Sequence, residues 1–161
     1  MTILSSITSD GRKPDGETYS FTKLSLWEDD ATACPSTVSE LVQVNCYDGS
    51  VDSLVVSTRT TDYSSGEYIL ITVPEAERFD PDDLTGGFYL SSSTDFTSVL
   101  EIEGSTDCIV EHIRINKTGA GDLFSAESAV KGFEATFSHC YANMLRTECR
   151  LKAFYCTLSR K

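Results

Sequence analysis

The stretch Val110–Ile115 (VEHIRI) decides the fold, because closely similar stretches follow it toward the carboxyl end. Val130–Ala135 (VKGFEA) begins twenty positions later, and Cys149–Ala153 (CRLKA) repeats the central triplet eighteen positions beyond that. Each copy contains the order apolar, charged, apolar. Side chains alternate between the two faces of a strand, so this order predicts strands whose apolar side chains are buried. Recurrence at about twenty residues predicts strands stacked as successive coils of a solenoid.

The charged residues in the middle of the three copies are Arg114, Glu134 and Lys152. Equivalent positions in a parallel stack lie about 4.8 Å apart, so these residues are expected to form a ladder. Their charges alternate in sign and attract, although exposed ion pairs contribute no more than about 1 kcal/mol each. Chance repetition is the alternative, because short strands flanked by charges are common in β proteins.

Further strand-like runs precede these copies and are separated by turn signals such as Asp48-Gly49 and Gly86-Gly87. The runs are Leu41–Tyr47, Ser53–Thr58, Tyr68–Pro74, Gly87–Leu90 and Val99–Ile102. So many short strands predict an all-β protein. The 161 residues are expected to form one domain, with an amino-terminal arm and capping helix over 1–40 and β coils over 41–161.

One short helix is expected near Ser20 to Asp30, because Phe21, Leu24 and Trp27 recur three residues apart on one helical face. Ser20 is the candidate N-cap. We expect Trp27, the single tryptophan, to anchor this helix on the core. A stacking platform for a sugar or a base is the functional alternative.

The net charge of −12 is unevenly distributed. Residues 1–129 carry −16, whereas residues 130–161 carry +4 from six basic and two acidic side chains. Strong acidity argues against nonspecific nucleic-acid binding, which needs a basic face. The sequence has no apolar run of the roughly 18 residues that a membrane span requires, and its first residues lack the features of a secretory signal. We therefore expect a protein made in the cytoplasm and not exported by the general route.

Cysteine occurs at positions 34, 46, 108, 140, 149 and 156, never as a C-x-x-C pair. Zinc sites usually contain such pairs together with histidines, and His139-Cys140 is an isolated dipeptide. We therefore expect free buried thiols and no metal or cofactor. Asp80-Pro-Asp82-Asp83 lacks the ligand spacing of a known calcium loop and is interpreted as a turn.

The segment Asp15–Asp29 (DGETYSFTKLSLWED) resembles the phrase that opens many right-handed parallel β-helix proteins of bacteriophages and related mobile elements. Val42–Asp48 is similar to their first strand, Tyr68–Arg78 to their second and Val110–Ile115 to their first full coil. The resemblance covers residues 15–155. It implies an amino-terminal capping helix followed by a short right-handed parallel β-helix, here of about four or five coils.

The chain is shorter than family members with enzymatic or host-recognition roles. A short stack is expected to leave its last coil open, with unpaired backbone groups and an exposed apolar cross-section. We expect other chains to cover it, most simply by formation of a homotrimer or docking on a larger assembly. The expected partner interface comprises Arg146, Arg150, Lys152, Phe154, Tyr155, Arg160 and Lys161.

The sequence contains two catalytic alternatives. Lys117–Phe124 (KTGAGDLF) is similar to the signature of ribokinase-like sugar kinases, in which a glycine turn at a helix start holds phosphate and Asp122 would be the base. The alternating α/β pattern of those kinases is absent. Glu111, Arg114 and Glu134 are a possible catalytic trio of the kind found in polysaccharide lyases and hydrolases, or simply a solvated charged face.

Three functional classes follow. The first is a non-enzymatic virion protein, a capsid decoration (cement) subunit or a short tail adaptor that acts as an oligomer on phage capsid or tail proteins. The second is a carbohydrate-binding or carbohydrate-cleaving module of the tail-spike type. The third is the sugar kinase. Short length and the lack of a distinctive acid cluster favour the first.

Overall fold

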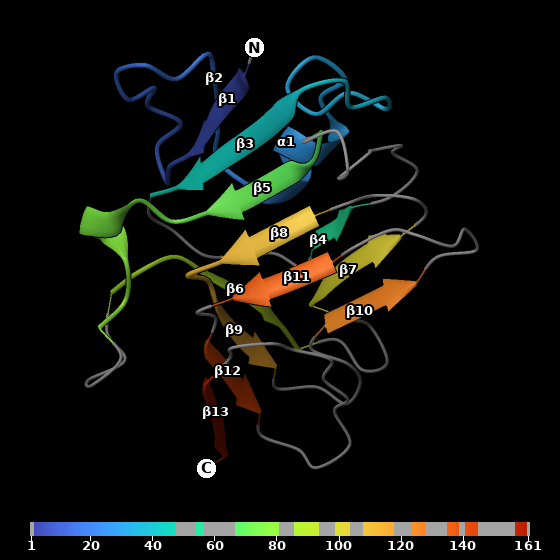
Figure 1. Ribbon diagram of the computed structural model, residues 1–161. Coiled ribbons are helices and arrows are strands. Elements are labelled where there is room, and N and C mark those ends of the chain that lie inside the picture. The colour runs from blue at the N-terminus through green and yellow to red at the C-terminus, as the bar shows by residue number, and fades with distance from the viewer. Residues whose placement is uncertain are drawn as a thin grey trace.

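The computed structural model describes residues 2–47, 54–56, 67–80, 86–93, 99–103, 108–117, 124–127, 135–138, 141–144 and 157–160. This part of the chain is predominantly β, as predicted, and contains one short α-helix and one 3-10 turn (Figure 1). The helix is α1 (Leu24–Asp29), and the turn is η2 (Glu75–Glu77). The strands are β1 (Thr2–Ile7), β2 (Tyr19–Phe21), β3 (Leu41–Cys46), β4 (Leu54–Val56), β5 (Ile69–Thr72), β6 (Tyr89–Ser92), β7 (Leu100–Glu103), β8 (Cys108–Glu111), β9 (Arg114–Lys117), β10 (Phe124–Glu127), β11 (Ala135–Ser138), β12 (Tyr141–Met144) and β13 (Thr157–Arg160).

The strands form three sheets, and every pairing between described strands is parallel. The six-stranded sheet has the order β11-β8-β5-β3-β1-β2, the three-stranded sheet β10-β7-β4, and the four-stranded sheet β13-β12-β9-β6. From β5 to β12 the chain visits the six-, four- and three-stranded sheets in a fixed, repeated order. Figure 1 shows this progression from the amino terminus at the top to the carboxyl terminus at the bottom.

Register stacks equivalent inward-facing positions directly over one another. In the six-stranded sheet Val42 pairs with Ile69, which pairs with Cys108, and all three side chains are buried. The four-stranded sheet places Leu90 beside Ile115, and the three-stranded sheet places Leu100 beside the Leu54 position. These aliphatic rows form the core between the sheets. Alternating burial along β3, with every second residue buried, is the period-2 pattern of a strand that packs on one face.

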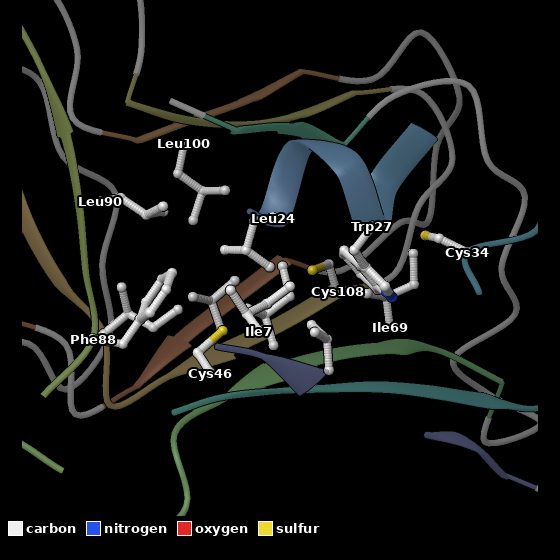
Figure 2. Close-up of a cluster of buried hydrophobic side chains, with 14 of the residues drawn as sticks. Ile7, Leu24, Trp27, Cys34, Cys46, Ile69, Phe88, Leu90, Leu100 and Cys108 are labelled. Carbon is white, nitrogen blue, oxygen red and sulfur yellow. The ribbon is translucent and has the colours of Figure 1, made fainter. Parts of the chain in front are cut away.

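Helix α1 covers part of this core near the amino-terminal strands. It contacts β1, β2 and β4. Figure 2 shows Leu24 and Trp27 extending from α1 toward Ile69 and Cys108, and both α1 side chains are buried. The prediction that Trp27 anchors the helix on the core is confirmed.

The predicted start of this helix is wrong. Ser20 lies in β2, where its hydroxyl donates to the backbone oxygens of Gly11 and Arg12 at 2.6 and 2.8 Å. The helix begins at Leu24 after Lys23, which makes no side-chain cap. Phe21 is in the strand because Tyr19–Phe21 pairs with β1, and this pairing overrides the three-residue apolar spacing.

The stretch Val110–Ile115 is not one strand. It spans the end of β8, the corner residue His112 with φ of 61°, and the start of β9. Within it, the triplet Ile113-Arg114-Ile115 has the predicted alternation, with both isoleucines buried and Arg114 half-buried. The second copy ends where β11 begins, and Ala135 pairs with Cys108. Ala135 therefore lies in the six-stranded sheet, whereas Arg114 and Ile115 lie in the four-stranded sheet.

The predicted charge ladder is consequently wrong at Arg114. Its strand neighbours are Tyr89, 25 positions earlier, and Tyr141, 27 positions later. Glu134 and Lys152 lie outside the described residues. The apolar–charged–apolar triplet occurs in any half-buried strand, so its twenty-residue recurrence does not give the spacing between paired strands.

Strand β1 was not expected from the sequence, which placed residues 1–40 apart from the coils. Thr2–Ile7 pairs with β3 along its whole length and lies inside the six-stranded sheet. Its inward row contains Ser5, which is fully buried although serine is a polar residue. Because a serine stands at this inward position, the alternation of apolar and polar residues that identifies a strand is not visible in the sequence of β1.

Candidate functional site

The outer faces of the three sheets carry the side chains that are candidates for function. Each face has its own chemistry. In the three-stranded sheet, alternation with the buried Leu100 and Ile102 places Glu101 at an outward position. The other two faces contain the polar contacts that the structure resolves in detail.

A buried carboxylate lies against the outer face of β3. Glu17 is only 6% exposed. Its Oε1 accepts a hydrogen bond from the Asn45 side-chain amide at 2.7 Å and another from the Tyr47 hydroxyl at 3.0 Å. Gln43 in turn donates to the Asn45 side-chain oxygen at 2.8 Å. The Oε2 of Glu17 is buried without a hydrogen-bond partner. Loop residue Glu17 is thereby fixed to the sheet.

These contacts also change the acidity of Tyr47. Burial is the largest cause that raises the pKa of its phenol, and the adjacent Glu17 carboxylate raises the pKa further. Both effects disfavour the phenolate. Tyr47 is therefore held as a neutral hydrogen-bond donor to Glu17, and it is not poised to act as a base at neutral pH.

A second hydrogen bond continues the same outward row. Thr72, at the end of β5, pairs in register with Asn45 and donates from its hydroxyl to Glu111 Oε1 at 3.1 Å. Glu111 ends β8. Each carboxylate of the row thus has a donor supplied by a neighbouring strand.

The predicted trio is divided by the fold. Glu111 lies in the six-stranded sheet, Arg114 in the four-stranded sheet beyond the His112 corner, and Glu134 outside the described residues. The outward row of Glu111 contains Thr72 and Asn45, and that of Arg114 contains Tyr89. The trio was predicted on the assumption that Val110–Ile115 is one strand, and this assumption is wrong.

On the four-stranded sheet, Arg114 stacks on Tyr89. The guanidinium carbon is 5.5 Å from the centroid of the Tyr89 ring, a cation–π distance. The backbone nitrogen of Arg114 also donates to Phe88 at 3.1 Å. Tyr89 was not predicted as a neighbour of Arg114, because the two residues are 25 positions apart and only the pairing of β6 with β9 brings them together.

Of the residues in the predicted partner interface, only Arg160 lies within the described part of the chain. Arg160 is the last residue of β13, which pairs with β12 in the four-stranded sheet. The other predicted interface residues, Arg146, Arg150, Lys152, Phe154, Tyr155 and Lys161, lie outside the described residues.

The kinase-like motif connects two strands. Lys117 ends β9 and Phe124 begins β10, while residues 118–123 of the motif, including Asp122, lie outside the described residues. A phosphate site of this type needs a helix that starts at the glycine turn. Strand β10 begins at Phe124, the last residue of the motif, and this strand weighs against the kinase.

Cys34, Cys46 and Cys108 are buried thiols, as predicted, and burial raises the pKa of the Cys46 thiol. Cys140, Cys149 and Cys156 lie outside the described residues, as do His139, Asp82 and Asp83. Within the described ranges, no group of three or more His, Cys, Asp or Glu side chains is arranged to hold a metal ion.

Among the helices of the described chain, none has the length and apolarity needed to cross a membrane. Comparison with known proteins gave no match: no family model, no curated protein and no solved structure is similar to this chain at the level required for a match.

Proposed function

We propose that the chain is a right-handed parallel β-helix and that it serves as a non-enzymatic structural protein of a phage virion. The observation that carries the architecture is the repeated visiting order of the three parallel sheets from β5 to β12, with inward positions in register. In a β-helix each circuit of the chain adds one strand to every sheet, and this arrangement supports that description.

The role follows from what such a stack provides. Aliphatic rows such as Val42, Ile69 and Cys108 fill the interior, so the sheets are held by a continuous core. The outer faces present polar and charged side chains without a helical layer over the described strands, and they are available for contact with other proteins. Together with the sequence resemblance to phage proteins, this supports a capsid decoration subunit or a short tail adaptor that acts as an oligomer.

Mass spectrometry of density-purified particles tests the role. In particles of the phage that carries the gene, we expect the chain at a fixed ratio to the major capsid or tail protein. Comparison of complete particles with tailless heads separates decoration from tail attachment. Detection of the chain in the infected lysate together with its absence from washed particles would contradict the proposal.

Light scattering of the purified full chain tests oligomerisation separately. A homotrimer is the expected species. A monomer at micromolar concentration that also fails to bind assembled capsids or tails would remove support for a structural subunit.

A further inference from the structure

We propose that the outer face of the six-stranded sheet binds an amphipathic helix of a partner protein, one whose apolar stripe is flanked on one side by lysine or arginine. The proposal deepens the structural role by naming the chemistry of the partner, and in that respect it rests on the proposed function. We call this surface the Leu70 face; it comprises the outward positions of β1, β3, β5 and β8.

Burial and register show which side chains form this face. One inward row is fully buried and crosses four strands, and it consists of Ser5, Val44, Ile71 and Val110. Side chains alternate between the two sides of a sheet, so the residue that precedes each of these in its strand lies on the outer side. These outward residues are aligned across the same four strands and are half-buried, and they are Leu4, Gln43, Leu70 and Ile109.

No described element of the chain lies over this row. Figure 1 views the sheet from its outer side, with α1 behind β3 and the ribbons of β3, β5 and β8 in front. Leu24 and Trp27 of α1 extend into the core, which places the helix on the inner side (Figure 2). Three of the four side chains in the row are aliphatic and partly exposed. Neighbouring apolar side chains left uncovered in this way are typical of a surface that contacts another molecule.

The width and the spacing of the row fit a helix. Neighbouring strands lie about 4.8 Å apart, so the row across four strands is about 14 Å long and one side chain wide. Successive turns of a helix are about 5.4 Å apart, whereas side chains on one face of an extended strand repeat at about 6.6 Å. The helical repeat is the closer of the two. Apolar residues three and four positions apart on a helix are therefore suited to pack along this row.

The two borders of the row differ in charge. On the side of the strand carboxyl ends, Glu111 is the outward residue at the end of β8, and Glu17 is bound to Asn45 of β3. On the opposite side, the outward positions of β1 and β3 are the uncharged Thr2 and Leu41. A partner helix with lysine or arginine over the Glu111 border gains an attraction that a neutral or acidic helix lacks.

A second copy of this chain is disfavoured as the occupant. It offers a row of the same spacing, but two sheets that pack face to face make contact beyond one row and bury the carboxylates at the border. Each copy also has a net charge of −12. Charge therefore favours a basic partner over self-association through this face.

Fluorescence anisotropy of a labelled synthetic helix tests the proposal on the purified full chain. The probe is a peptide of about 18 residues with leucine along one stripe and lysine along one flank of that stripe. A second peptide has glutamate in place of every lysine. We expect the lysine peptide to bind, and the glutamate peptide to bind at least about tenfold more weakly.

Two variants within the Leu70 face have matched controls on α1. Leu70→Ser is expected to weaken binding of the lysine peptide about tenfold by removing an apolar contact, whereas Leu26→Ser, at an exposed leucine of α1, leaves it unchanged. Glu111→Gln is expected to weaken binding about threefold, and its amide oxygen still accepts a hydrogen bond from the Thr72 hydroxyl. Asp29→Asn, at an exposed acid of α1, is the charge control and is expected to leave the affinity unchanged.

Absence of lysine-peptide binding overturns the proposal, as does equal binding of the two peptides. Equal losses of affinity in Glu111→Gln and Asp29→Asn overturn it as well, because the peptide then responds to net charge alone. If Leu70→Ser does not fold, the comparison of Glu111→Gln with Asp29→Asn decides. A lower mass of folded Leu70→Ser than of the original chain in light scattering would show that a second copy occupies the face, and the proposal then fails. None of these results bears on whether the chain is found in virions, which particle mass spectrometry tests separately.

Discussion

At the scale of single residues, Glu17 is the least ordinary feature of the described chain. A carboxylate that is 6% exposed costs free energy unless it is well hydrogen-bonded, and only one of its oxygens has donors. Asn45 lies in β3 and Tyr47 follows directly after it, whereas Glu17 precedes β2. The contact therefore holds the loop between β1 and β2 against the middle of the six-stranded sheet.

Replacing Glu17 by alanine is expected to lower the free energy of unfolding by about 1–3 kcal/mol, because the Asn45 amide and the Tyr47 hydroxyl lose their shared acceptor. Urea titration monitored by circular dichroism measures the loss. Glu75→Ala, an exposed change in η2, is the control and is expected to stay within about 0.5 kcal/mol of the original. Equal stability of the two variants would mean that the Glu17 contacts contribute nothing net.

Tyr47 is expected to ionise at higher pH than an exposed tyrosine, because burial and then Glu17 raise its pKa. The pKa in the folded state lies above that in the unfolded state. The neutral phenol thus contributes stability fully below about pH 10, and this contribution is lost as pH rises through the folded-state pKa. Spectrophotometric titration of phenolate absorbance measures the shift. Tyr47→Phe is expected to delete the late-titrating component, and its persistence in that variant would refute the assignment.

His112 occupies a left-handed conformation, with φ of 61°, at the corner between β8 and β9. Asparagine tolerates this region, and a β-branched residue does not. We expect His112→Asn to be close to neutral and His112→Val to lower thermal stability, at a cost of about 1–2 kcal/mol. Differential scanning calorimetry separates the two. Similar melting temperatures for both variants would show that the corner relaxes without strain.

At the scale of elements, the parallel register determines which side chains share the inner or the outer face of each sheet. The expected strands at Leu41–Tyr47, Tyr68–Pro74 and Val99–Ile102 correspond to β3, β5 and β7, because each run contains β-branched residues and apolar residues at alternate positions. Which strands become neighbours was not predictable. The spacing between paired strands varies, as Val42 lies 27 positions before its partner Ile69, and Ile69 lies 39 positions before Cys108. A search for one fixed repeat cannot find such partners.

Cross-linking tests this register directly. Gln43 and Leu70 are outward register partners on β3 and β5, and such neighbours lie about 4.8 Å apart, within disulfide range. We expect Gln43→Cys with Leu70→Cys to form a disulfide under mild oxidation, identified by peptide mass mapping. Gln43→Cys with Ile109→Cys spans two strand intervals and should remain reduced. Bridging in the second pair but not in the first would contradict the strand order.

At the scale of the whole molecule, composition and strand content predicted the predominantly β class, and no sequence signal predicted the candidate faces. Tyr89 and Arg114 are 25 residues apart, and Glu17 and Tyr47 are 30 apart, so neither pair has a local pattern. Only the order of strands brings them together. The expected interface near the carboxyl end rested on an open final coil, and Arg160 alone among its residues is placed.

Each inward row of side chains packs across adjacent strands, so it connects the early strands of the six-stranded sheet to the later ones. The contribution of one such row to stability can be measured. Ile71 lies in the middle of the inward row, between Val44 and Val110, and is fully buried. Ile71→Ala is expected to lower the free energy of unfolding by about 2–5 kcal/mol by loss of burial and creation of a cavity. Exposed Leu26→Ala is the control and should cost little.

The Ile71→Ala variant also tests whether the described sheets unfold as one cooperative unit. Trp27, the single tryptophan, reports by fluorescence on the region around α1, whereas far-ultraviolet circular dichroism reports on all strands. In the original chain both transitions are expected to coincide in urea. Weakening the middle row at Ile71 reduces the coupling between the α1 end and the later strands, so the two transitions should separate. If the fluorescence and circular dichroism transitions shift by the same amount, the core unfolds as a single cooperative unit, and the expected loss of coupling at Ile71 is wrong.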